Sequence, residues 1–305
     1  MNDILVVGSL NMDLVVRAPR FPAPGETISG EDLAIIPGGK GANQAVAAAR
    51  LGAAVSMLGR VGSDVFGQSL LDNLTKNKVN TSRVRRDTAA TGTATIIVDA
   101  HGQNSIVLSP GANGKVSPDD VADWPDAKIL IMQFEIPSET VLRAAQQARE
   151  KEMRVIVNPA PARKVGPELL KLVDILIPNE SELSLLTGTP VTDSASAEAA
   201  ARRMIAQGVG MVIVTRGEHG SLTVTQNDIY HVPAFQVEVI DTTAAGDAFI
   251  GGLAVALAED KPIREALTNA NACGALAVTR FGAQPSLPTR DEVQIFLNIH
   301  RKSSG

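Results

Sequence analysis

The segment KILIMQFEIPSETVLRAAQQAREKEMRVIVNPA, residues 128–160, has the pattern of a βαβ unit. It begins and ends with short runs rich in Ile, Leu and Val, and an amphipathic helical pattern lies between them at 138–151. Buried apolar strands that alternate with helices are typical of right-handed βαβ units. The segment therefore predicts a parallel sheet that is covered by helices on both faces.

The same alternation continues toward the C-terminus. DILIPNE (174–180) and MVIVTRG (211–217) are two more apolar runs, and the helical pattern SAEAAARRMIAQG (196–208) precedes the second. In open α/β sheets, ligands bind beyond the carboxyl ends of the strands. Each of the four runs stops at a polar residue that could also be a turn former or helix cap, and together these residues predict a cleft: Glu135, Asn158, Asn179 and Thr215.

The first third of the chain differs from the rest. Around 13–36 and 89–110, strand-like stretches surround Pro and Gly turns, and DAHGQN (99–104) has the composition of a hairpin turn. We expect these strands to form a small antiparallel β lid over the cleft, with an exposed apolar face that could pair with a second copy. The predicted fold is one α/β domain over residues 1–305, with a mainly parallel central sheet and this lid.

Composition excludes several classes of function. The chain has 305 residues, of which 44% are hydrophobic and 20% charged, and its net charge is −5 with acids and bases mixed. No basic face suggests nucleic acid or anionic lipid, and one Trp and one Tyr argue against base stacking. The single cysteine, Cys273, excludes an internal disulfide and a multi-cysteine zinc site, and its apolar surroundings predict burial. No apolar stretch is long enough to span a membrane, and the acidic N-terminal segment is unlike a signal peptide, so we expect a cytoplasmic protein.

The segment PGGKGANQAVAAARLG (37–52) is a Gly-rich turn that leads into an Ala-rich helix. It is not a Walker motif, because Ala34 replaces the first Gly and Gly41 replaces Ser or Thr, and the chain has no G-x-G-x-x-G. Tight packing explains the glycines but not Lys40 and Asn43, whose donors suit the hydroxyl groups of a sugar.

For three shorter motifs, a purely structural role is an alternative to a functional one. Asn11 and Asp13 follow the first strand and are expected to face one side, although an Asx turn would also explain them. Asn179 and Glu182 in PNESE have the spacing of a capping box. VTRGEHG (214–220) could be only a hairpin turn.

The segment TTAAGDAFIGG (242–252) starts a helix with small residues and a single carboxylate, Asp247. The unpaired N–H groups of a helix N-terminus suit an anion, which Asp247 would repel. A first-turn acid that stabilises the helix dipole by a few tenths to about 1 kcal/mol is the structural alternative. Phosphoryl transfer explains both features, since the N–H groups would stabilise the transferring group while Asp247 takes the proton of the attacking hydroxyl.

Several motifs together resemble the ribokinase-like (PfkB) carbohydrate kinases. GGKGANQAVAAARLG (38–52) is similar to the N-terminal signature of that family, and DTTAAGDAFIGGLAVAL (241–257) to its C-terminal signature, usually D-T-x-G-A-G-D. NPAPAR, IPNESE, VTRGEHG and VTRFGAQPSLP resemble the intervening segments in family order, so the resemblance runs from VVGSLNMD to QPSLP. Ala244 departs from the general Gly, and Ala-Ala-Gly-Asp is common in the branch that phosphorylates ribose.

The resemblance implies ATP-dependent phosphorylation of D-ribose to D-ribose 5-phosphate, with Mg²⁺ and with K⁺ as activator. Asp247 would be the general base, and the anion hole would consist of the backbone N–H groups of Ala244, Ala245, Gly246 and Asp247. The implied sugar contacts are Asn11, Asp13, Gly39, Lys40, Asn43, Glu135 and Asp247. The implied ATP contacts, with Glu182 reaching the water shell of Mg²⁺, are Asn179, Glu182, Thr215, Gly217 and Asn271. The implied K⁺ ligands are Asp241, Thr243, Ala277, Arg280, Gly282 and Ser286. The family also implies a homodimer in which two lids clasp.

Other functions stay open at this point. The acceptor could be 2-deoxyribose or a ketohexose such as fructose, with specificity set by lid side chains including Met12, Ala94, Ile96 and Leu108. The scarcity of aromatic residues disfavours a nucleoside acceptor. A sugar-binding regulator without turnover is a further alternative, but such a sensor would need neither Asp247 nor the small residues before it.

Overall fold

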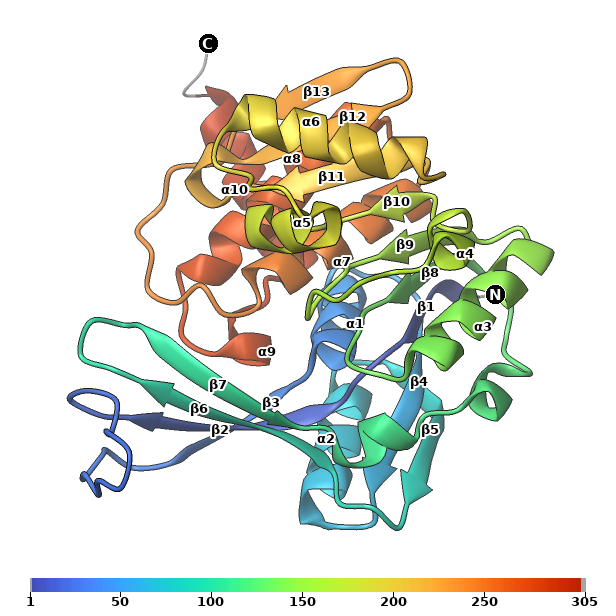
Figure 1. The fold of residues 1–305 in the computed structure, drawn as a ribbon. Coiled ribbons are helices and arrows are strands. Elements are labelled where there is room, and N and C mark those ends of the chain that lie inside the picture. Colours follow the sequence, from blue (N-terminus) through green and yellow to red (C-terminus); the bar gives the residue numbers. More distant parts are fainter. Residues whose placement is uncertain (1, 303–305) are drawn as a thin grey trace.

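The computed structural model describes residues 2–302 and contains two β-sheets (Figure 1). The larger sheet has nine strands in the described part of the chain, in the order β13-β12-β11-β10-β9-β8-β1-β4-β5. All neighbours pair in parallel except at β11–β12 and β12–β13. The strands are β1 (Asn2–Val7), β4 (Val55–Gly62), β5 (Asn80–Asp87), β8 (Ala127–Met132), β9 (Arg154–Val157), β10 (Ile175–Leu176), β11 (Met211–Thr215), β12 (Ser221–Thr225) and β13 (Ile229–Val232).

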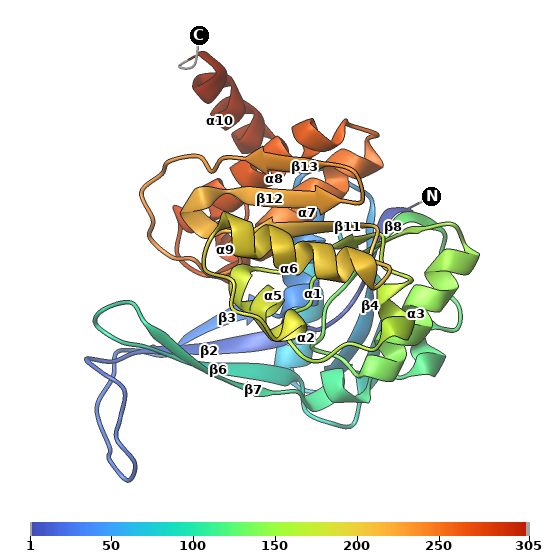
Figure 2. The same ribbon diagram turned by 45° about the horizontal axis from the view of Figure 1, so that its top comes forward.

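Helices cover both faces of this sheet (Figure 2). The longer helices of one face are α1 (Lys40–Arg50), α2 (Val65–Lys76), α7 (Ala245–Ala258), α8 (Ile263–Val278) and α10 (Arg290–Lys302). The other face carries α3 (Ser138–Glu150), α4 (Pro167–Leu170), α5 (Glu180–Thr187) and α6 (Ser194–Ala206). Residues 4–7 of β1 are all apolar because both faces of the strand are buried: Ile4 and Val6 pack into the core on one face of the sheet, and Leu5 and Val7 into the core on the other.

The α/β prediction is confirmed. The four apolar runs that the sequence pointed to are β8, β9, β10 and β11, which lie side by side in parallel. VTRGEHG does form a turn, which includes the 3-10 helix η3 (Gly217–His219), between the antiparallel strands β11 and β12. Cys273 is buried, as expected.

The smaller sheet, called the lid below, projects from one end of the molecule (Figure 1). Its strands lie in the order β3-β2-β6-β7. The outer pairs are antiparallel and the central β2–β6 pair is parallel, and Asp99–Gln103 forms the turn between β6 and β7. The strands are β2 (Asn11–Arg17), β3 (Ala34–Gly38), β6 (Gly92–Val98) and β7 (Asn104–Ser109).

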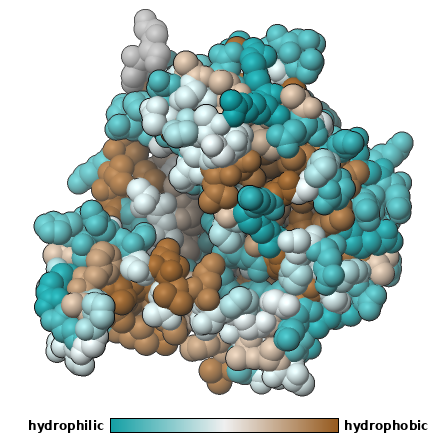
Figure 3. Space-filling model, viewed as in Figure 1, coloured by the Kyte–Doolittle hydropathy of each residue, from teal (hydrophilic) through white to brown (hydrophobic). Residues whose placement is uncertain are grey.

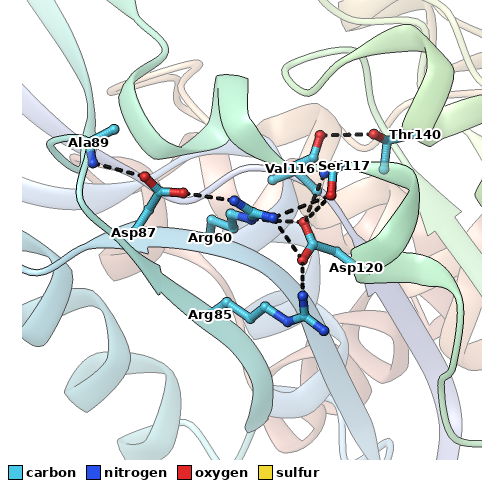
Figure 4. A network of polar contacts seen from close by, with 8 residues as sticks. All are labelled: Arg60, Arg85, Asp87, Ala89, Val116, Ser117, Asp120 and Thr140. Atoms are coloured by element: carbon cyan, nitrogen blue, oxygen red, sulfur yellow. Dashed lines mark hydrogen bonds and ion pairs between the residues drawn. The ribbon is translucent and has the colours of Figure 1, made fainter.

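A charged network fixes the base of the lid (Figure 4). Arg60 on β4 donates through Nη1 to Asp87 Oδ2 (2.8 Å), at the end of β5 and just before β6. Its Nε donates to Asp120 Oδ2 (2.8 Å) in the 3-10 helix η2 (Pro118–Val121), which follows β7 and the 3-10 helix η1 (Gly111–Lys115). Arg85 also pairs with Asp120 (2.8 Å). One guanidinium therefore joins the segment that leads into the β6–β7 hairpin to the segment that follows it.

Among residues 2–302, none of the helices combines the length and the apolarity that crossing a bilayer requires.

Candidate active site

The Gly-rich turn before α1 is shaped by a close approach of two backbones. Gly39 has φ 88°, and a Cβ at this position would lie 2.6 Å from the backbone N of Asn11. Only glycine fits both conditions. The turn starts α1 directly beside β2, and Lys40 lies near enough to Asp13 for their charges to interact.

The start of α7 is equally specific. Ala244, its N-cap, has the left-handed φ of 61°, a region that favours glycine, which explains the Gly of the general family pattern. Asp247 lies in the first turn and is only 6% exposed. Ala245 N is already bonded to Thr242 O (3.3 Å), whereas Gly246 is exposed and a Cβ there would meet no atom within 4 Å. The helix N-terminus is therefore open beside a buried carboxylate.

Two amides on α1 hold the carboxylate of Asp247. Asn43 Nδ2 donates to Asp247 Oδ2 (2.9 Å), and Gln44 Nε2 donates to Asp247 Oδ1 (2.8 Å). Asn43 Oδ1 is buried and has no hydrogen-bond partner among the described residues. A buried acceptor without a partner is costly, so this oxygen next to Asp247 fits a donor that arrives with a ligand.

Glu135, three residues beyond β8, connects the polar groups near Asp247. Its Oε2 accepts hydrogen bonds from Ser9 Oγ, from the backbone N of Lys40 (3.2 Å) and from Asn11 Nδ2 (3.4 Å). Asp13 is 8% exposed, and its carboxylate accepts no hydrogen bond from the described residues. We call Asn11, Asp13, Lys40, Asn43 and Glu135 the sugar cluster; its oxygens and nitrogens suit several adjacent hydroxyl groups.

The charges of the site are strongly coupled. Burial, followed by the negative charges of Glu135 and Asp247, raises the pKa of Asp13 to about 7, against the effect of Lys40. Burial alone would lower the pKa of Lys40, but the surrounding carboxylates, Asp247 first, raise it above the usual lysine value. Burial also raises the pKa of Asp247, while Lys40, Asn43 and Gln44 act in the opposite direction. A group with a raised pKa that keeps hydrogen-bond donors is suited to accept a proton.

A cavity of about 800 Å³ opens at the start of α7, beside the turn that carries Asp247. Thr242, Ala245 and Gly246 line it at the start of α7, so the helix N-terminus points into it. Of the residues predicted to contact ATP, the cavity is lined by Asn179, Thr215, Gly217 and Asn271. Apolar walls that the sequence did not suggest come from Val237, Val239, Phe249 and Val278. The size and the mixture of polar and apolar walls suit a nucleotide.

The predicted capping box at α5 is present. Asn179 Oδ1 accepts from Glu182 N (2.8 Å), and Glu182 Oε2 accepts from Asn179 N (2.9 Å). Burial raises the pKa of Glu182 overall, although the hydrogen bond from Asn179 N and the charge of Lys40 act in the opposite direction. Asn271 Nδ2 donates to the carbonyls of Val232 and Pro233 (both 3.1 Å), which leaves its carbonyl oxygen free of these bonds.

The residues predicted to hold K⁺ lie on two segments that Asp241 connects. Asp241 Oδ1 accepts from Thr243 N (2.9 Å) and Thr243 Oγ1 (2.6 Å), and Asp241 Oδ2 accepts from Gly282 N (2.9 Å). Ser286 Oγ donates to Ala283 O (2.8 Å). The donor set of a carboxylate, carbonyls and a hydroxyl consists of hard oxygens, which fits an alkali cation, although the Ala277 carbonyl already accepts from Arg280 N (3.2 Å).

Sequence reasoning missed three polar residues behind the site: Ser9, which donates to Glu135, Gln44, which donates to Asp247, and Asn113, which bonds Asn11. One signal was available. Gln44 interrupts the Ala-rich face of α1, where the neighbouring residues are packed against the core, so a buried partner for its amide could have been expected.

A buried carboxylate at a helix N-terminus, bonded to a cluster of polar side chains and next to a nucleotide-sized cavity, is the arrangement expected of a kinase that acts on a polyhydroxylated small molecule. The chain belongs to the pfkB family of carbohydrate kinases, whose family model matches residues 1–290.

Known proteins are similar in sequence to this chain over almost its whole length. The chain is 42% identical to a ribokinase of Haemophilus influenzae over 300 residues, which cover 96% of this chain and 98% of the relative. It is 38% identical to a deoxyribokinase of Salmonella typhi over 304 residues, 98% of this chain and 99% of the relative. The structure of Arabidopsis thaliana ribokinase complexed with ribose and ATP superposes with a TM-score of 0.91 at 36% identity, covering 97% of this chain and 98% of that one.

Proposed function

We propose that this kinase transfers the γ-phosphoryl group of ATP to the 5-hydroxyl of D-ribose and forms D-ribose 5-phosphate. One observation carries the proposal: Asp247, at the open N-terminus of α7, is hydrogen-bonded to Asn43 of the sugar cluster and directly follows Ala245 and Gly246, which line the nucleotide-sized cavity. The similarity to ribokinases, one of them in complex with ribose and ATP, supports the choice of substrates.

In the proposed mechanism, Asp247 accepts the proton of the 5-hydroxyl as this oxygen attacks phosphorus. The backbone N–H groups at the start of α7, residues 244–247, stabilise charge on the transferring group, and that of Ala245 contributes least because it already donates to Thr242 O. Asn43 Oδ1 and the carboxylates of Asp13 and Glu135 accept hydrogen bonds from the remaining sugar hydroxyls. Lys40 balances the negative charge of these carboxylates.

Two cations complete the proposal. Glu182 would hold Mg²⁺ through its water shell, and the metal would neutralise charge on the phosphates of ATP. Its second carboxylate oxygen, Oε1, makes no hydrogen bond within the capping box and fits this role. The Asp241 segment would hold K⁺, and the sugar kinase activity of Asp241→Ala should then lose its dependence on K⁺.

We also propose that residues 1–305 form one domain whose lid pairs with the lid of a second copy. The lid exposes the large apolar residues Leu33, Ile35, Ile106, Val107 and Leu108. Figure 3 shows brown hydrophobic residues gathered over the lid, beside the hollow that separates it from the body of the molecule. Such a patch is typical of an interface. Sedimentation that finds only monomer at micromolar concentration would refute the dimer.

The substrate is tested by incubating the protein with MgATP and KCl and with D-ribose, 2-deoxyribose or fructose in parallel. We expect ribose to be favoured by about 100-fold or more in kcat/KM, because a site built around hydroxyl groups rejects an analogue that lacks one. The deoxyribokinase relatives make 2-deoxyribose the second candidate, and a preference for it would overturn the choice of ribose while keeping the mechanism. Sugar and ATP that bind without phosphoryl transfer would indicate a sensor.

A further inference from the structure

Behind Asp247 lies a chain of buried amides that the family signatures do not explain by themselves. Gln44 Nε2, which donates to Asp247 Oδ1 (2.8 Å), also donates to Asn158 Oδ1 (3.3 Å), and Gln44 Oε1 accepts from Gln133 Nε2 (2.6 Å). Gln44 and Gln133 are 0% exposed and Asn158 is 7% exposed. These three residues, called the amide chain below, come from α1 and from the residues that directly follow β8 and β9.

The hydrogen bonds of the amide chain have one consistent direction. Asn158 Nδ2 donates to the Ile177 carbonyl (3.0 Å), which can only accept, so Asn158 must present its oxygen to Gln44. The carboxylate of Asp247 also accepts, so Gln44 must present its nitrogen to both and its oxygen to Gln133. The orientation of Asn158 is therefore fixed by a backbone carbonyl, that of Gln44 by a carboxylate, and that of Gln133 by the oxygen of Gln44.

The packing around the amide chain leaves room for it. A Cβ on Gly8, the residue after β1, would lie 2.0 Å from Gln133 Oε1, so this end of the chain requires glycine on the adjacent strand. Gln44 is fully buried, so it has no surface to offer a sugar. Within the described part of the chain, its side chain is hydrogen-bonded to Asp247 but to no member of the sugar cluster.

We propose that Gln44 is the positioning residue of Asp247, and that Gln133 and Asn158 hold Gln44 in the one orientation that donates to this carboxylate. The inference rests on the proposed role of Asp247 as general base. Gln44 occupies one acceptor position of Oδ1 and Asn43 one of Oδ2, which sets the plane of the carboxylate and stabilises its charged form. Loss of a donor to a carboxylate disfavours the charged form, so a base without it needs a higher pH to act.

The test is the pH profile of kcat at saturating ATP and sugar for Gln44→Met, which keeps the length of the side chain and removes its amide. We expect the acid limb of the profile to move up by about one pH unit or more, with KM for the sugar changed less than about twofold. Gln147→Met is the matched control, since Gln147, which lies on α3, is 5% exposed and donates to Ala122 O (3.0 Å). An acid limb of Gln44→Met that stays at the wild-type position overturns the proposal.

A second variant tests the proposal in case Gln44→Met folds poorly. Gln133→Met leaves the bond from Gln44 to Asp247 but removes the amide that orients Gln44, so the acid limb should move in the same direction by a smaller amount. If it does not move, the proposal is wrong.

Asp247→Asn separates this inference from the proposed function. If Asp247→Asn keeps wild-type kcat, the base assignment itself fails, whereas an inactive Asp247→Asn with an unshifted Gln44→Met refutes only the positioning role.

Discussion

Asn43 donates from Nδ2 to Asp247 Oδ2 over 2.9 Å, and this hydrogen bond joins the first turns of α1 and α7, 204 residues apart in the sequence. It brings the two family signatures into one site. A donor of the first signature and the carboxylate of the second are thereby held in one geometry within the folded protein. Such preorganisation lowers the cost of reaching the reactive arrangement.

The role of Asp247 leads to the first prediction. Asp247→Asn keeps the size of the side chain and removes the proton acceptor, so kcat should fall by at least about 10²-fold while sugar affinity changes little. Steady-state kinetics gives kcat, and calorimetric titration with sugar gives the affinity. A variant with near-normal kcat would exclude Asp247 as the base.

We expect the charged form of Asp13, which is proposed to bind the sugar, to lower the stability of the folded protein. In the folded protein its pKa is raised to about 7, so the charged carboxylate is disfavoured there relative to the unfolded chain, where its pKa is about 4. The resulting loss of stability is absent below pH 4, grows between pH 4 and 7, and is complete above 7. Without sugar, Asp13→Asn should therefore be more stable than wild type at pH 8 by about 1–3 kcal/mol and similar to it near pH 4.

Urea unfolding at the two pH values checks this prediction, and sugar titration should show affinity weakened by about tenfold or more. An Asp13→Asn protein that is no more stable than wild type at pH 8 would mean that the charge of Asp13 is not disfavoured by burial.

The sequence predicted the features whose cause is local. The runs that became β8 to β11 are apolar because both faces are buried, and the capping box at Asn179 depends on residues three apart, so a single segment contains the whole signal. The polar residues at the strand ends were predicted to converge, and Asn179 and Thr215 do form a bridge. The family resemblance added Asp247 and the sugar cluster as candidates.

Other features depend on partners that the sequence does not place together. The bond from Gln133 to Gln44 joins a strand end to a helix interior, and either glutamine alone resembles an ordinary polar residue. The parallel β2–β6 pair at the centre of the lid also joins distant segments. Such contacts follow from the tertiary arrangement, which periodicity and turn composition do not encode.

Asn113 gives the next prediction, because it ties the lid base to the sugar cluster. Its Oδ1 accepts from Leu10 N (2.9 Å), and its Nδ2 donates to Leu10 O (3.0 Å) and Asn11 Oδ1 (2.7 Å). Asn113→Asp would replace the donating nitrogen by an oxygen that faces two acceptors, Leu10 O and Asn11 Oδ1, at a position that is only 1% exposed. We expect a loss of about 1–3 kcal/mol in the free energy of unfolding and a higher KM for the sugar through displacement of Asn11.

Urea unfolding and steady-state kinetics test both parts. Asn80→Asp, an exposed asparagine on β5, is the control and should change neither quantity. If Asn113→Asp lowers stability but leaves KM for the sugar unchanged, Asn113 does not position Asn11.

Ala244 offers a stabilising change. Its left-handed φ of 61° is costly for a residue with a Cβ, and glycine is also the better N-cap residue. Ala244→Gly should raise the free energy of unfolding by about 0.5–1 kcal/mol, after the greater freedom of glycine in the unfolded chain is deducted. Ala206→Gly, at the exposed end of α6, is the opposite control and should lower it. Thermal unfolding of both variants tests this prediction. If both lower the free energy of unfolding by the same amount, the backbone of Ala244 is not strained.

Arg60 should hold the lid base through its geometry as well as its charge. Hydrogen bonding to Ala89 N and then to Arg60 lowers the pKa of Asp87. Burial would raise the pKa of Asp120, but bonds from Arg60 and Ser117 N lower it overall. Both acids therefore stabilise the fold at neutral pH, and their contribution is lost as the pH falls below about 4.

Arg60→Met should lower the free energy of unfolding by about 2–4 kcal/mol at pH 7, because Asp120, whose side chain is 2% exposed, keeps only Arg85 as a charged partner. Arg60→Lys should recover only part of this loss, since an ammonium cannot reach Asp87 and Asp120 with the fixed fork of a guanidinium. Urea unfolding at pH 7 measures both variants. Full recovery by lysine would show that the charge alone holds the β6–β7 hairpin, and an unchanged stability in Arg60→Met would show that the network does not hold it at all.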